Sequence, residues 1–232
     1  MARSPNTSRL GGARIAEADS VVVIGLGRFG KAVSRELMAA GTDVLGIDLD
    51  EDIVQSMSGD LTHVVRADST NEEALRQLGV PDFERAVVAI GIDIQSSILT
   101  TSILMGFNIP HVWAKAISET HGRIFTQLGV QHVIYPEQDM GRRVAHMVRG
   151  AALDYIEIDR DFEIVRMSPN SLCLGGSLGE EHIRSRFGVT VLAYNREGQG
   201  WVNADADTVL EPGDNILVSG SVRSAEAFGQ LR

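Results

Sequence analysis

The stretch VVVIGLGRFGKAV at residues 21–33 decides the fold of this chain. Its first four residues are continuously apolar, which is typical of a strand buried on both faces of a parallel sheet. The pattern G-x-G-x-x-G follows directly at residues 25–30, and apolar residues then recur with helical spacing. Such glycines alone are weak evidence, but the order strand, loop and helix is what a dinucleotide-binding motif requires. We therefore expect a Rossmann-type unit that binds the phosphates of a nucleotide.

Each glycine of this loop has a distinct physical task. Gly25 permits a tight turn, Gly27 lets a pyrophosphate approach the backbone, and Gly30 allows the helix to pack closely on the strand. The amide groups and the dipole at the helix N-terminus attract the negative charge of phosphate. Phe29 lies within the loop and is included among the predicted binding residues. The alternative is that these glycines only form turns.

Two acidic residues lie at or just after the ends of predicted strands. Asp48 ends the predicted strand 43–48, 23 residues after Gly25, where a carboxylate accepts hydrogen bonds from both ribose hydroxyls. The same charge repels a 2′-phosphate, so NADP is disfavoured. Asp68 follows the predicted strand 62–66 and has two open roles: contact with the adenine edge, or a cap for the next helix.

Arg28 lies inside the glycine loop. Backbone amides and the helix dipole already serve the inner phosphates, so a guanidinium at this position is available for a terminal phosphate. This favours ADP or ATP as the ligand. The alternative, an ordinary exposed arginine, stays open.

Outward from the loop, predicted strands alternate with helical segments. The strands cover residues 21–25, 43–48, 62–66, 85–90, 111–115 and 132–135. This βα alternation predicts an α/β fold of the Rossmann type, with a doubly wound parallel sheet. Thr70 followed by Glu73 predicts a capping box before one of the helices.

After a helix predicted over 139–150, the pattern changes into a small α+β C-terminal lobe. Its predicted elements are strands over 155–158, 162–167, 189–194 and 215–218 and a helix over 179–187. The predicted organisation is therefore a flexible N-terminal tail (1–18), a nucleotide-binding Rossmann domain (19–138), a linker or crossover helix (139–151) and a C-terminal domain (152–232).

Composition excludes several classes of protein. The chain has 232 residues, 44% of them hydrophobic, which is enough for sizeable cores. Its net charge of -10 repels phosphate backbones, so we expect no nucleic-acid partner.

We find no apolar run of the roughly 20 residues that a spanning helix needs, so any membrane association must come through a partner. Residues 1–12 lack the apolar core of a secretory signal, and the single cysteine, Cys173, excludes an intramolecular disulfide.

These features, taken together, resemble the RCK/KTN family, and within it the KtrA and TrkA type of potassium uptake subunit. The resemblance rests on GLGRFG (25–30), VAIG (88–91), IQSSILTT (94–101), VWAKA (112–116) and PEQDMG (136–141). It implies a regulatory protein without catalysis, which binds ATP or ADP, or in some members NAD or NADH. It also implies homodimers that assemble into an octameric ring under a potassium-conducting membrane subunit, so the protein would be cytoplasmic and peripheral on the inner face of the membrane.

The resemblance also implies roles for particular residues. Arg28 would reach the terminal phosphate at a dimer interface, and Glu137 would contribute to a divalent-cation site there, for Mg²⁺ or Ca²⁺. Two copies of Glu137, phosphate oxygens and water would be needed, and the alternative is that Glu137 only favours the dipole of its helix. In similar proteins the second lobe binds cyclic di-AMP, for which Arg184 is the candidate contact. A surface arginine is the alternative there.

A different class of function, an NAD-dependent oxidoreductase, is compatible with the same fold. Such an enzyme needs a substrate site and usually a proton-transfer group that faces the nicotinamide. The second lobe offers His182 and Tyr194, but neither lies in a recognisable catalytic pattern. Regulation is therefore the preferred hypothesis.

Overall fold

The computed structural model describes residues 20–148, 153–159 and 161–231. The chain divides into two compact units, Met1–Pro136 and Glu137–Arg232, and each is described by itself. The predicted tail (1–18) and residues 149–151 of the predicted linker lie outside the described residues.

The first unit is built on a six-stranded parallel sheet with the strand order β3-β2-β1-β4-β5-β6. The strands are β1 (Ser20–Ile24), β2 (Asp43–Asp48), β3 (His63–Arg66), β4 (Arg85–Val88), β5 (His111–Lys115) and β6 (His132–Ile134). The helices are α1 (Arg28–Ala39), α2 (Glu51–Met57), α3 (Glu72–Gln77), α4 (Ile94–Gly106) and α5 (Glu119–Gln127), with a short 3-10 turn at Val80–Asp82. The strand order reverses between β1 and β4, as a doubly wound sheet requires.

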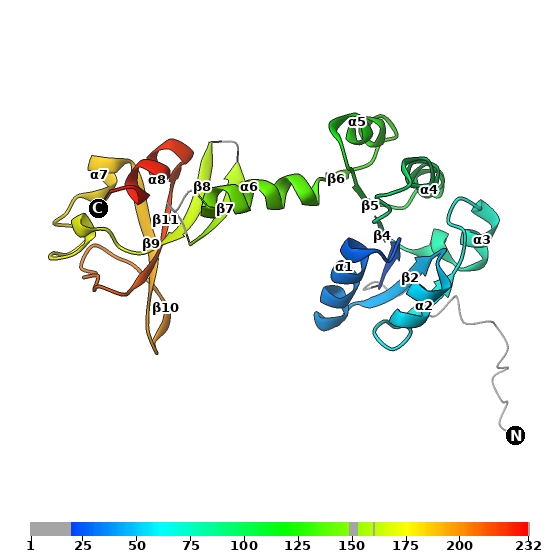
Figure 1. The fold of residues 1–232 in the computed structure, drawn as a ribbon, viewed down its shortest axis with the longest axis horizontal. Helices are drawn as coiled ribbons and strands as arrows, with labels where there is room; N and C mark the ends of the chain where they lie inside the picture. The colour runs from blue at the N-terminus through cyan, green and yellow to red at the C-terminus, as the bar shows by residue number, and fades with distance from the viewer. Residues whose placement is uncertain (1–19, 149–152, 160, 232) are drawn as a thin grey trace, which may run out of the picture. The chain divides into compact units, whose positions relative to one another are not determined.

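Alternate residues of the strands enter two separate cores. The helices that contribute to these cores are labelled in Figure 1. On one face Val21 and Val23 of β1 pack with Met57 of α2 and Phe29 and Leu37 of α1. The other face of β1 packs with side chains from α3, α4 and α5, including Leu75, Leu104 and Phe125. Because both faces are covered, the strands are continuously apolar, as the sequence predicted.

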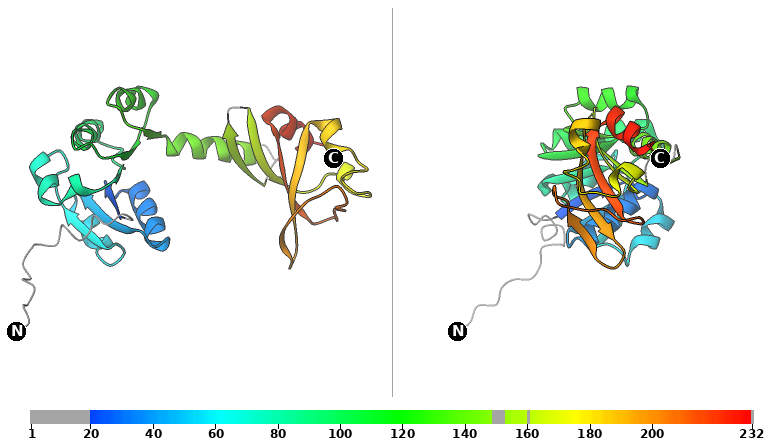
Figure 2. Two further views of the ribbon diagram at one scale, coloured as in Figure 1. Left: turned by 180° about the vertical axis from the view of Figure 1, so that it is seen from behind. Right: turned by 90° about the vertical axis from the view of Figure 1, so that its left-hand side faces the viewer.

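The second unit contains a five-stranded sheet with the order β10-β9-β11-β8-β7, and every described pairing in it is antiparallel. Its elements are α6 (Pro136–Val148, whose first residue belongs to the first unit), β7 (Asp154–Asp159), β8 (Phe162–Met167), a 3-10 turn (Ser171–Cys173), α7 (Ile183–Phe187), β9 (Val189–Arg196), β10 (Gly200–Asn203), β11 (Asn215–Ser221) and α8 (Val222–Gly229). Helices α7 and α8 contact the sheet, and α8 is drawn in red in Figure 2. Phe187 and Phe228 lie against each other in the core of this unit.

The predicted α/β fold with a small α+β lobe is confirmed, and local details differ. The cap of α3 is Asn71, whose side chain accepts from the amides of Glu73 and Ala74, so the predicted Thr70 capping box is wrong. Only 183–187 of the predicted helix 179–187 is helical. Backbone bonds from the amides of Leu178 and Gly179 to residues 208 and 206 hold the preceding segment against a distant loop. Strand β10 and helix α8 were not predicted, because each is short and follows a strand without a strong start signal.

Candidate functional site

Two glycines of the loop are required by the packing of the first unit. Gly25 has a φ of +91°, and a Cβ there would lie 2.9 Å from the backbone nitrogen of Ile90. A Cβ on Gly30 would overlap the carbonyl oxygen of Gly25. Their amide-rich turn is therefore pressed against the segment that follows β4, and a larger residue at either position would displace α1.

Gly27 differs from these two glycines. A Cβ there would meet no atom within 4 Å, and its φ of -65° is open to any residue. The protein's own packing does not explain why this position lacks a side chain. A bound phosphate needs a backbone that no side chain blocks, and Gly27 provides it.

The N-terminus of α1 is also the exception among the helices of the first unit. Helices α2, α3, α4 and α5 are each capped by a side chain, from Asp50, Asn71, Asp93 and Ser118 respectively. Among the five helices α1 to α5, only α1 starts without a side-chain cap, and its first turn carries no acidic residue. The first amides of a helix otherwise need an acceptor, so this end is suited to an external anion.

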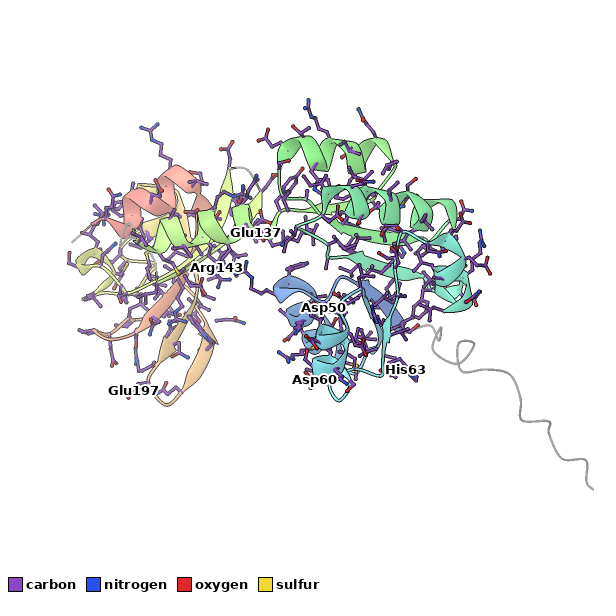
Figure 3. All side chains as sticks on the ribbon, turned by 45° about the vertical axis from the view of Figure 1, so that its right-hand side comes forward. Asp50, Asp60, His63, Glu137, Arg143 and Glu197 are labelled. Atoms are coloured by element: carbon purple, nitrogen blue, oxygen red, sulfur yellow. The ribbon has the colours of Figure 1, made fainter. Side chains whose placement is uncertain are left out.

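Asp48 lies at the carboxyl end of β2, beside the loop. Its Oδ2 accepts a hydrogen bond of 2.6 Å from the amide of Leu26, and its Oδ1 accepts one of 2.9 Å from the amide of Asp50. Figure 3 labels Asp50 at the start of α2. Both carboxylate oxygens of Asp48 are therefore held in place, and each keeps a lone pair for a further donor. The two predicted features, glycine loop and acid, are joined directly by one hydrogen bond.

Asp68 is exposed and has a local role. Its Oδ1 accepts hydrogen bonds from the amide (2.9 Å) and the hydroxyl (2.7 Å) of Thr70. These bonds, the side-chain one first, lower the pKa of the Asp68 carboxyl. It does not cap α3, because Asn71 does so. Contact of Asp68 with an adenine edge stays a prediction.

Arg28 and Phe29 point to different environments. Arg28 is exposed in the first turn of α1, while Phe29 is half-buried and packs on the core that α1 shares with α2. Phe29 also has a neighbour that was not predicted as a site residue: the ammonium of Lys115 lies 5.5 Å from its ring centroid. The available signal was a lysine at the end of an otherwise buried predicted strand.

Arg184 lines a pocket in the second unit. The pocket has a volume of about 570 Å³ and is formed by α7, the start of β9 and residues 204–206. Arg184 is exposed, and its Nε donates a 3.0 Å hydrogen bond to the hydroxyl of Thr190, which holds the guanidinium at the pocket wall. His182 and Ile183 contribute to the same wall.

Glu137, labelled in Figure 3, is exposed in the first turn of α6. Asp139 adds a second acid to that turn. Within residues 20–148, 153–159 and 161–231, no group of three or more His, Cys, Asp or Glu side chains could hold a metal ion. Glu137 therefore does not complete a cation site within one chain. In the same residues, no helix is long and apolar enough to cross a membrane.

Known proteins match both units. The TrkA-N domain model matches residues 21–136, and the TrkA-C domain model matches residues 162–231. Ktr system potassium uptake protein C of Bacillus subtilis is 36% identical over 207 residues, which cover 89% of this chain and 94% of that protein. Ktr system potassium uptake protein A of Vibrio alginolyticus is 36% identical over 199 residues, or 85% of this chain and 90% of that protein.

Solved structures share the fold. The GsuK channel bound to NAD superposes with a TM-score of 0.60 at 15% identity, covering 98% of this chain and 40% of that chain. GsuK bound to ADP superposes with a TM-score of 0.50 at 21% identity, covering 60% of this chain and 36% of that chain. This chain therefore spans less than half the length of these channel proteins.

Proposed function

This chain belongs to the TrkA-N/TrkA-C family of potassium uptake proteins, and from that premise we propose that it is the nucleotide-sensing subunit that gates a Ktr- or Trk-type potassium channel or transporter. The family's Ktr proteins are regulatory subunits, so the chain is a regulator and not an enzyme. This also removes the alternative of an NAD-dependent oxidoreductase.

One observation carries the nucleotide assignment: the uncapped N-terminus of α1 at Gly27, beside the fixed carboxylate of Asp48. The amides suit phosphate, and the carboxylate suits the two hydroxyls of an unphosphorylated ribose. Arg28 adds a charge suited to a terminal phosphate, which favours ATP or ADP. NAD or NADH is the second candidate, because the GsuK channel of the same fold binds NAD and ADP.

Gating then follows from differential affinity. A nucleotide changes the shape of an assembly only if it binds one shape more tightly than another. We propose homodimers assembled as an octameric ring, in which Arg28 reaches the terminal phosphate across a dimer interface. The ring would lie in the cytoplasm, held at the inner face of the membrane by the potassium-conducting subunit. Light scattering should give about eight times the 25.1 kDa chain mass, and a stable monomer would contradict the ring.

Two further ligands belong to the proposal. A divalent cation, Mg²⁺ or Ca²⁺, would lie between two copies of Glu137 and phosphate oxygens, since one carboxylate cannot supply the six or more oxygens required.

Cyclic di-AMP would occupy the pocket at Arg184, whose volume of about 570 Å³ and arginine wall suit an anionic dinucleotide. Titration of the full chain with cyclic di-AMP, against an Arg184→Ala variant, tests this; equal heats for both proteins would remove Arg184 from the site.

The function itself is tested by potassium flux into vesicles that carry a Ktr-type membrane subunit. We expect the added chain to give different flux with ATP and with ADP. A matched variant, Arg223→Ala on α8, changes an arginine outside the proposed site and should keep the difference. Equal flux with ATP, ADP and no nucleotide, in a complex that forms, would contradict nucleotide gating.

A further inference from the structure

His121 is a buried imidazole in the first turn of α5. Only 2% of its surface is exposed, and the centroid of its ring lies 4.3 Å from that of Phe125, which is fully buried. Its Nδ1 accepts a long hydrogen bond of 3.5 Å from the amide of Ile117, in the loop that joins β5 to α5. Among the described residues, its Nε2 has no hydrogen-bond partner. The ring is therefore enclosed, with one nitrogen acting as an acceptor and the other unsatisfied.

Three features of this position favour the neutral ring over the imidazolium. An Nδ1 that accepts a hydrogen bond from the Ile117 amide carries no proton. The first turn of a helix is the positive end of its dipole, where a cation is unfavourable. Burial lowers the pKa of the His121 imidazole, because the charged form loses its hydration. Protonation must therefore break the contact with Ile117 or bring the ring out to water.

The described elements packed around His121 offer no carboxylate placed to pair with an imidazolium. Helix α4, which packs on α5, has no charged residue over 94–106. Glu119 is exposed on α5 itself, two residues from His121, and side chains at that spacing do not face each other. The other titratable groups on α5, at the N-cap of α4 and along β5 and β6 are Arg123, Asp93, His111, Lys115, His132 and Tyr135. The one carboxylate among them, that of Asp93, binds the amide and hydroxyl of Ser96.

From this geometry we propose that His121 is a pH-sensitive switch for the start of α5: the neutral ring holds the loop 116–118 on the helix, and a proton on the ring opens the first turn. This loop also contacts the segment that follows β4, because a Cβ on Gly91 would lie 3.7 Å from Cγ2 of Ile117. Opening therefore alters the carboxyl edge of the sheet. The proton acts on the ligand-free chain, so the switch does not depend on the proposed nucleotide site.

The direction of the pH dependence follows from linkage. An opened turn exposes the imidazole, which then binds a proton near its ordinary pKa of about 6.5, whereas the closed turn binds one only at lower pH. The closed turn is therefore fully favoured above about pH 6.5. Below this pH, opening becomes more favourable by up to about tenfold per pH unit, until the pKa of the closed state is reached. A ring that binds a proton equally well in both states would give no such dependence.

Hydrogen exchange of the full chain, measured by mass spectrometry at about pH 7.5 and pH 5.5 and corrected for the intrinsic pH dependence of exchange, tests the switch. In the wild type, the protection of residues 117–125 should fall at least about threefold at the lower pH, while that of β1 stays unchanged. His121→Gln keeps a neutral acceptor for the Ile117 amide, so its protection should not depend on pH. The control His63→Gln changes an exposed histidine on β3 and should behave as the wild type.

Two results would overturn the proposal. Equal corrected protection of residues 117–125 at the two pH values in the wild type removes the switch, and this result needs no variant. An equal loss of protection in the wild type and in His121→Gln assigns the pH dependence to another group. His121→Phe, which keeps a ring against Phe125, is a second variant that should lack the dependence and serves if His121→Gln does not fold.

Discussion

The substitution Gly27→Asp gives opposite expectations for stability and for ligand binding. Position 27 has an extended backbone with a φ of -65°, and a Cβ there would meet no atom within 4 Å, so aspartate fits without strain. It would supply the side-chain cap that α1 lacks and place a negative charge at the positive end of the helix. Relative to glycine, the cap and the dipole together stabilise by about 0.5–1 kcal/mol. For a chain of this size, that raises the Tm of the ligand-free protein by about 1–3 °C.

Binding should change in the other direction. A carboxylate about 4 Å from a phosphate charge repels it by about 4 kcal/mol at an effective dielectric constant near 20. Because position 27 is exposed, solvent screening reduces this, and we expect about 2 kcal/mol, or roughly a 30-fold weaker affinity for ADP. Adenosine should lose much less.

The assay is calorimetric titration of ADP and adenosine into wild-type, Gly27→Asp and Gly27→Ala proteins, with Tm measured on the same ligand-free samples. Gly27→Ala separates the steric effect of a Cβ from the effect of charge and should weaken ADP binding less than aspartate does. A Gly27→Asp protein that is folded and binds ADP as tightly as wild type would refute the assignment of phosphate to this helix end.

Four other outcomes are expected. Asp48→Asn keeps an acceptor for the Leu26 amide but loses the charge, so ADP should bind about 1–2 kcal/mol more weakly, with NADP losing less than NAD in a competition assay. Arg28→Ala should reduce the preference for ATP over ADP while ADP affinity is nearly kept; an unchanged ratio would make it an ordinary surface residue. Glu137→Gln should remove any effect of Mg²⁺ or Ca²⁺ on nucleotide binding, measured by repeating the titrations with a chelator. Asp214 is 2% exposed and accepts hydrogen bonds of 2.9 and 2.8 Å from Arg196, which lower the pKa of its carboxyl. Its stabilising contribution is therefore fully present above the unfolded pKa of about 4 and is lost progressively as pH falls from there through the lower folded pKa. Asp214→Asn should therefore lower stability by about 2–3 kcal/mol at neutral pH and by progressively less as pH falls below the unfolded pKa, as followed by urea unfolding.

The first unit was predictable because its signals are local and repeated. Buried parallel strands are continuously apolar, and the glycine loop has a fixed position after β1, so residues 43–48 and 111–115 were predicted with the bounds that the structure gives. The second unit was less predictable. Its strand β10 is exposed at every residue and has no apolar alternation to reveal it. The segment before α7 is held by backbone bonds to a loop almost 30 residues away, which no local pattern encodes.

The residues around the candidate site were also only partly predictable from the sequence. Gly25, Gly30 and Asp48 follow from spacing, because their tasks are set by the turn and by the end of β2. The position of Lys115 beside Phe29 was not predicted, because it depends on the sheet order β1-β4-β5 and on the space left by Gly91. Neither the sheet order nor the space at Gly91 can be read from the sequence.

The central claim is that the N-terminus of α1 binds the phosphates of an adenine nucleotide. Calorimetric titration of ADP into the ligand-free full chain, with adenosine as the comparison, tests it most directly. We predict saturable binding of one ADP per chain, with adenosine bound much more weakly. Absence of ADP binding to the folded chain, or equal affinity for ADP and adenosine, would contradict it.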